Sequence, residues 1–156
     1  MAEVLFYHLT ATPLEASLPE LLDRSLARGW RVVVRCGSEP GMAALDAALW
    51  TWRDEAFLPH GTAAMGHAGL QPIYLTLGDE VPNGATVLML VDGARATLAE
   101  MAGFERTCLL FDGHDPRAVE TARADWRTIR DAGLPARYWA QESGRWVQKA
   151  TSGTAV

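Results

Sequence analysis

Arg31-Val32-Val33-Val34-Arg35-Cys36 carries three consecutive branched apolar residues at its centre. A strand with this pattern buries both of its faces, which is typical of a parallel strand covered by helices on either side. A second stretch, Val4-Leu5-Phe6-Tyr7-His8-Leu9, is rich in aromatic and branched residues and also predicts a strand. Between the two, leucines recur at helical spacing over 14–26, and Gly29 follows as a stop signal.

The alternation of strand and helix patterns continues along the chain. Further strands are expected at 73–77, 86–91 and 107–111, with one or two short final strands around 137–146. The pair Asp115-Pro116 predicts an N-cap and first helical position, and this last long helix is expected to end at Gly133. The segment 53–71 is predicted to be a long loop. We therefore expect one α/β domain over 1–150 with a mostly parallel sheet, and a frayed tail over 151–156.

Composition restricts the classes of protein to consider. Of 156 residues, 49% are hydrophobic and 21% are charged, so the chain can bury a core, and its net charge is −5. An acidic total argues against a large footprint on nucleic-acid phosphates, although it leaves room for one small basic site. No signal peptide or membrane span is recognised, and Cys36 and Cys108 are expected to be reduced buried thiols. These features predict a soluble cytoplasmic protein with no membrane association and little direct nucleic-acid binding.

The turns that could bind a nucleotide lack the required residues. The turn after the first strand, His8-Leu9-Thr10-Ala11-Thr12-Pro13, contains no glycine, so neither glycine-rich phosphate-binding motif fits there. The turn Gly37-Ser38-Glu39-Pro40-Gly41 has glycines but no lysine, and its glutamate would repel phosphate. We therefore expect no nucleotide-binding loop and no cofactor. Because His60, His67 and His114 lack the spacing of a metal motif, we expect no metal either.

An enzymatic alternative rests on polar residues at strand ends. Asp92 and Asp112 follow strands at their carboxyl ends, where α/β active sites gather, and His60 lies in a loop. Both aspartates also fit ordinary Asp-Gly turns, Asp115 is explained as a helix cap, and no paired nucleophile and base is recognised. We expect no enzyme, and keep as an alternative a small nucleotide-binding domain or enzyme with its site at these strand ends.

Large rings gather near the middle of the chain. Trp50 lies at a predicted helix end, and Phe57 lies in the irregular segment that follows. These rings could cap the edge of the core, or they could form an exposed aromatic patch that anchors a protein interface.

The last long helix carries a second unusual cluster. Arg123, Trp126, Arg127 and Arg130 are spaced i, i+3, i+4 and i+7, so they share one helix face. They could be a solvated basic stripe with the tryptophan packed on the core. Alternatively, they could form a pocket for an acidic peptide that ends in an aromatic residue, with arginines holding carboxylates and the indole offering an apolar wall.

Several motifs together resemble one protein family. Phe6-Tyr7-His8-Leu9 resembles the FYxL opening of the chi subunit of bacterial DNA polymerase III, and Leu45-Asp46-x-x-Leu49-Trp50 with Phe57-Leu58-Pro59-His60 resembles its LDxxLW…SFxPH segment. Pro72-Ile73 matches the start of a family strand. Arg123-x-x-Trp126-Arg127-x-Ile129-Arg130-x-x-Gly133 matches the family's basic and aromatic helix. The order and spacing of these motifs hold across nearly the whole chain.

The resemblance implies a Rossmann-like fold without nucleotide site or catalysis, and a role as an adaptor. Chi proteins bind the acidic C-terminal tail of single-stranded DNA-binding protein, which ends in an aspartate, an apolar residue and a phenylalanine. By motif, Arg123, Trp126, Arg127 and Arg130 would hold that tail. Val119 stands where the family often has a lysine, so the resemblance implies no basic contact at this position.

A second surface is implied around the LW and SFxPH motifs, where chi meets the psi subunit of the clamp-loader complex. Trp50 and Phe57 match it, whereas Ala56 replaces the serine of SFxPH. The expected function is therefore to link single-stranded DNA-binding protein to the clamp loader. The partner at the second surface could instead be a helicase or another replisome protein.

Overall fold

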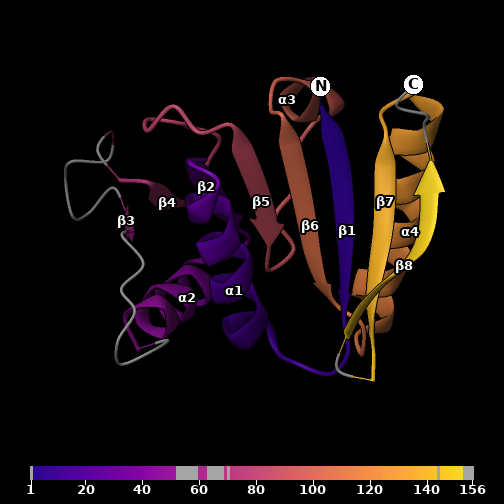
Figure 1. Ribbon diagram of the computed structural model, residues 1–156, viewed down its shortest axis with the longest axis horizontal. Helices are drawn as coiled ribbons and strands as arrows, with labels where there is room; N and C mark the ends of the chain where they lie inside the picture. The colour runs from indigo at the N-terminus through magenta and orange to yellow at the C-terminus, as the bar shows by residue number, and fades with distance from the viewer. Residues whose placement is uncertain (1, 52–59, 63–68, 70, 144, 153–156) are drawn as a thin grey trace.

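The structure, a computed structural model, describes residues 2–51, 60–62, 69, 71–143 and 145–152. Its strands form one sheet: β1 (Glu3–Leu9), β2 (Val32–Cys36), β3 (His60–Thr62), β4 (Ile73–Thr76), β5 (Val87–Val91), β6 (Arg106–Asp112), β7 (Ala136–Glu142) and β8 (Arg145–Ser152). The helices are α1 (Leu14–Ala27), α2 (Glu39–Thr51), α3 (Leu98–Ala102) and α4 (Pro116–Asp131). The strand order is β3-β4-β2-β5-β6-β1-β7-β8 (Figure 1).

The sheet is parallel except at one edge. β1 lies between β6 and β7 and is parallel to both, β2 lies likewise between β4 and β5, and β8 pairs antiparallel with β7. The valines Val32, Val33 and Val34 of β2 are each 0% exposed. This confirms the prediction of a helix-covered, mostly parallel α/β sheet, and the arrangement is Rossmann-like.

Helices cover the two faces of the sheet unequally. Val32 and Val34 join the core formed with α1 and α2, whereas Val33 joins the core formed with α3 and α4, because successive side chains of a strand point to opposite faces. Figure 1 shows α4 behind β7 and β8, and none of the described helices lies over β1 or β7 on the viewer's side. That face is covered instead by large side chains of the strands themselves: Trp139 and Trp146 pack there, and the Tyr7 and Trp146 rings meet edge to face at 5.1 Å.

The helix ends agree with the sequence except at one cap. Gly29 and Gly133 follow α1 and α4 with φ of 78° and 81°, a left-handed conformation that glycine adopts without steric cost. At the start of α1, Thr12 followed by a proline predicts Thr12 as the N-cap, but Pro13 is the N-cap residue and makes no side-chain capping bond. The Thr12 hydroxyl instead hydrogen-bonds the hydroxyl of Ser17.

Three segments differ from expectation. The short strand β3 lies inside 53–71, which was predicted to be loop. The final strands are longer than expected and form the β7–β8 hairpin. Strand β8 ends at Ser152, so two residues of the segment predicted to be a frayed tail are paired, and 153–156 lie outside the described residues.

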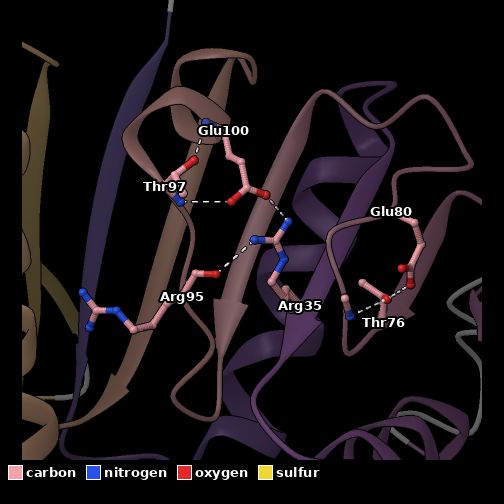
Figure 2. A network of polar contacts seen from close by, with 7 residues as sticks. Arg35, Thr76, Glu80, Arg95, Thr97 and Glu100 are labelled. Atoms are coloured by element: carbon pink, nitrogen blue, oxygen red, sulfur yellow. Dashed lines mark hydrogen bonds and ion pairs between the residues drawn. The ribbon is translucent and has the colours of Figure 1, made fainter.

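A polar network fixes α3 against the sheet (Figure 2). Arg35 of β2 is buried, and its guanidinium donates to Glu100 at 2.7 Å and to the carbonyl of Arg95 at 3.0 Å. Glu100 also closes a capping box with Thr97, in which each side chain accepts a hydrogen bond from the other residue's backbone N–H. One carboxylate therefore serves both the cap of α3 and its attachment to β2.

Candidate functional site

Helix α4 presents the predicted peptide-binding residues on one continuous helix. The helix begins after Asp115, whose carboxylate accepts a hydrogen bond from the N–H of Arg117 at 2.9 Å, and Pro116 occupies the first turn. Ala122 and Ile129 are buried against the sheet and fix how the helix is rotated. The basic stripe formed by Arg123, Arg127 and Arg130 is therefore exposed to solvent, next to the helix face that packs on the sheet.

Trp126 lies on that border. It is half-buried and meets the Phe6 ring edge to face at 5.4 Å and the Tyr138 ring at 6.0 Å. Part of the indole therefore belongs to the core, as one of the two interpretations of the sequence expected. The part that remains exposed lies beside the arginines.

The three arginines of the stripe are exposed. Within the described residues, Arg123 and Arg127 have no ion pair, and Arg130 contacts only its neighbour Asp131, at 3.2 Å. That pair is 50% and 71% exposed, and such surface pairs contribute between about 0 and 1 kcal/mol. The guanidinium groups are thus available to an external anion.

Tyr138 and His8 extend the ring cluster beside α4, and the sequence did not identify them. The phenol of Tyr138 is half-buried and lies 2.7 Å from Nδ1 of His8. Burial raises the pKa of Tyr138, and the positive charge of Arg123 partly opposes that rise. The alternation of side chains along a strand predicts that Tyr138 and Trp139 point to opposite faces of the sheet. Only the fold shows that Tyr138 is the one that faces α4.

The second predicted surface is described only in part. Trp50 belongs to α2, but its side chain and the whole of Phe57 lie outside the described residues. The neighbouring motif positions have structural roles: Leu45 and Leu49 are each 1% exposed, and Asp46 lies 3.0 Å from Nε2 of the buried His60. This contact ties β3 to α2, and the interface prediction for the two rings remains a prediction.

A cavity of about 990 Å³ lies at the carboxyl ends of β1, β5 and β6, where a Rossmann-like sheet usually binds its ligand. Asp92 and Asp112 line it, but each carboxylate already has an internal donor: the Ser38 hydroxyl at 2.5 Å and the N–H of His114 at 2.8 Å. The aspartates therefore act in turns, as the sequence allowed.

The anion-binding position of this cavity is filled by the chain itself. The backbone N–H groups of Thr10, Ala11 and Thr12 all donate to Oε1 of Gln141, at 2.9, 2.9 and 3.3 Å. In a nucleotide-binding Rossmann fold, N–H groups of the first strand–helix turn hold phosphate. Here the side-chain oxygen of Gln141 on β7 occupies the position that a phosphate would take. This agrees with the absence of a glycine-rich loop.

His60 is remote from those aspartates, so the three residues of the enzymatic alternative do not form one site. His60 of β3 lies three strands away from Val87 of β5, in the same row of paired residues across β4 and β2. Val87 precedes Asp92 by five residues. With about 4.8 Å between strands and 3.3 Å per residue, His60 is roughly 20 Å from Asp92. Among the described residues, no three His, Cys, Asp or Glu side chains group as a metal site, and no helix is long and apolar enough to span a bilayer.

Comparison with known proteins agrees with the motifs. The model of the family described as DNA polymerase III chi subunit, HolC, matches residues 1–137. The DNA polymerase III subunit chi of Pseudomonas aeruginosa is 28% identical over 138 residues, which cover 86% of this chain and 94% of that protein. The subunit chi of Escherichia coli K12 is 26% identical over 106 residues, covering 68% and 71% of the two chains.

The family match runs from β1 through α4 and ends as β7 begins, and the matches support an accessory subunit rather than an enzyme. They confirm the family that the motifs resembled and assign the chain to DNA replication. The chain belongs to the DNA polymerase III chi subunit family.

Proposed function

We propose that this chain is an adaptor that holds the acidic C-terminal tail of single-stranded DNA-binding protein on α4 and links it to the clamp loader. The observation that carries the proposal is a pair of exposed guanidinium groups, Arg123 and Arg127, without internal ion pairs among the described residues, beside the half-buried indole of Trp126. This arrangement suits a ligand with carboxylates and a terminal ring.

The physical reasoning separates two contributions. Guanidinium groups bind carboxylates in bidentate, charge-assisted hydrogen bonds, each contributing about 1.5–3 kcal/mol. The terminal phenylalanine of the tail would pack against the exposed part of Trp126 and replace water there. Since a coated strand displays many tails and the clamp loader holds several subunits together, linkage would raise the effective concentration of a weak single contact.

The second contact of the adaptor is proposed at Trp50 and Phe57, with a psi-like clamp-loader subunit as partner. The buried Leu45 and Leu49 and the contact of Asp46 with His60 support this, because they anchor the segment that carries the rings to the core. Loss of clamp-loader capture in a Trp50→Ala variant that retains tail binding would support the proposal. Unchanged capture would point to a different docking surface.

Isothermal titration with the terminal tail peptide of the cognate single-stranded DNA-binding protein tests the α4 site. We expect Arg127→Ala to weaken binding about tenfold or more, and Trp126→Phe, which keeps an aromatic ring in the core, to weaken it less than Trp126→Ala. Arg117→Ala is the matched control, because Arg117 is also exposed on α4 but lies in its first turn. Wild-type affinity in both Arg127→Ala and Trp126→Ala would refute the site.

A further inference from the structure

A second arginine and tryptophan cluster lies on the opposite face of the sheet from α4. It surrounds a cavity of about 240 Å³ beside the C-terminal half of α1. Arg24 of α1 and Arg28, the C-cap residue of that helix, line it, together with Arg106 of β6 and Arg137 of β7. Neither the family motifs nor the proposed tail site uses these residues.

Three of these four arginines are unneutralised. Arg106 pairs with Glu3 at 2.6 Å, whereas Arg24, Arg28 and Arg137 are exposed and have no carboxylate partner in the part of the chain that the structure describes. The chain as a whole has a net charge of −5, so this positive cluster differs in sign from the total charge of the molecule. The cluster is therefore the kind of small basic site that an acidic total does not exclude.

Indole rings are interleaved with these charges. Arg28 and Arg106 each place a guanidinium 4.9 Å from the ring centroid of Trp30. Trp139 and Trp146, which cover the part of this face over β1 and β7 where none of the described helices lies, line the same cavity. Within the described residues, the buried Nε1 of Trp139 has no hydrogen-bond partner.

We propose that this cluster is a binding site for single-stranded nucleic acid, a function beyond the proposed adaptor role. The combination of guanidinium groups for phosphates with aromatic rings for bases is typical of such sites. A cavity of 240 Å³ holds one ring system and leaves the rest of the ligand to run over the exposed arginines.

The distribution of charge favours a polyanion over an acidic peptide end. Arg106 and Arg137 lie on the two strands that flank β1, opposite Glu3 and Leu5, so their Cα atoms are about 12 Å apart. Arg24 comes from α1, and Arg28 is the C-cap residue of that helix. A strand with a phosphate at every nucleotide can contact the three unpaired arginines together, whereas a terminal carboxylate would use only one or two.

Fluorescence anisotropy of a labelled oligothymidylate of about 15 nucleotides, titrated with the full chain, tests this site. We expect binding that weakens with salt, with a slope of log K against log salt of about −0.7 for each phosphate contact. Arg28→Gln and Arg137→Gln should each weaken binding about tenfold and reduce the slope by about 0.7. These side chains are exposed, so the variants should unfold at the wild-type temperature.

Arg117→Gln is the matched control, because it removes the same charge from an exposed arginine outside both clusters. Equal losses in this control and in Arg28→Gln, or no oligonucleotide binding by the wild type, would overturn the inference. If Arg28→Gln weakened binding of the acidic tail peptide instead, the cavity would be a peptide site. Peptide binding that depends only on Arg127 would leave the adaptor proposal intact whichever result the oligonucleotide gives.

Discussion

Arg35 is a buried cation whose partner, Glu100, can still reach solvent. Their side chains are 7% and 30% exposed. Loss of the carboxylate leaves a guanidinium without charge compensation in a dry environment, whereas loss of the arginine leaves a carboxylate that water can solvate. We expect Glu100→Gln to lower the free energy of unfolding by about 3 kcal/mol, and Arg35→Met by about 1–2 kcal/mol, in urea unfolding.

Glutamine at position 100 can still complete the capping box with Thr97, so this comparison isolates the charge. Glu100→Ala, which also removes the cap, should cost about 1 kcal/mol more. A larger effect of Arg35→Met than of Glu100→Gln would show that packing of the arginine, rather than stranded charge, dominates.

The same pair predicts a dependence of stability on pH. The hydrogen bond from Arg35, followed by the one from the Thr97 N–H, lowers the pKa of Glu100 below its ordinary value of about 4.3. The stabilisation is therefore complete above that value and is lost as the pH falls through the lowered pKa. Between about pH 5 and pH 3, wild type should lose more stability than Glu100→Gln, so that the two curves converge in acid. Parallel curves from urea titrations would contradict this assignment.

At the scale of elements, the turn between β1 and α1 depends on one distant side chain. Gln141 of β7 accepts three backbone N–H bonds from that turn and donates through Nε2 to the Thr12 hydroxyl at 2.7 Å. Because the turn is exposed, water can replace part of this network, and we expect Gln141→Ala to cost about 1–2 kcal/mol in urea unfolding. Gln148→Ala, an exposed glutamine on β8, is the control and should be nearly neutral.

Elements set by local signals could be predicted, and those set by pairing across the fold could not. Asp115-Pro116 and Gly133 defined α4 because caps depend on neighbouring residues. The three-residue β3 has too few positions to show an alternation, and it is a strand only because β4 pairs with it. The role of Gln141 depends on a contact between segments about 130 residues apart, which no local pattern encodes.

The candidate site was predictable to the same extent. The spacing of Arg123, Trp126, Arg127 and Arg130 identified the shared helix face, because helical geometry is local. Which edge of Trp126 is buried depends on Phe6 and on the strand beside it, and so could be learned only from the sheet. The arginines around the second cavity come from three elements and show no spacing in the sequence.

At the scale of the whole molecule, the two basic clusters lie on opposite faces of one sheet. Trp126 of the α4 cluster packs into the core of the α3 and α4 face, whereas Trp30 and Trp139 pack into the other core. Acidic residues outnumber basic ones by 19 to 14, so each cluster is a local exception in an otherwise negative surface. Such a distribution favours two separate anionic ligands over one continuous nucleic-acid track.

This separation predicts how the two ligands affect each other. The arginines of the two sites are separated by the sheet and by the side chains packed on both of its faces, and layers pack about 10 Å apart, which exceeds the Debye length of about 8 Å at physiological ionic strength. The Kd of the tail peptide should therefore change less than about twofold when the oligothymidylate is saturating. At 0.01 M salt the Debye length is about 30 Å, so the two anions should repel and each should weaken the other. Competition at physiological salt would place both ligands in one site, and titration of the Arg28→Gln and Arg127→Gln variants would then identify which cluster holds them.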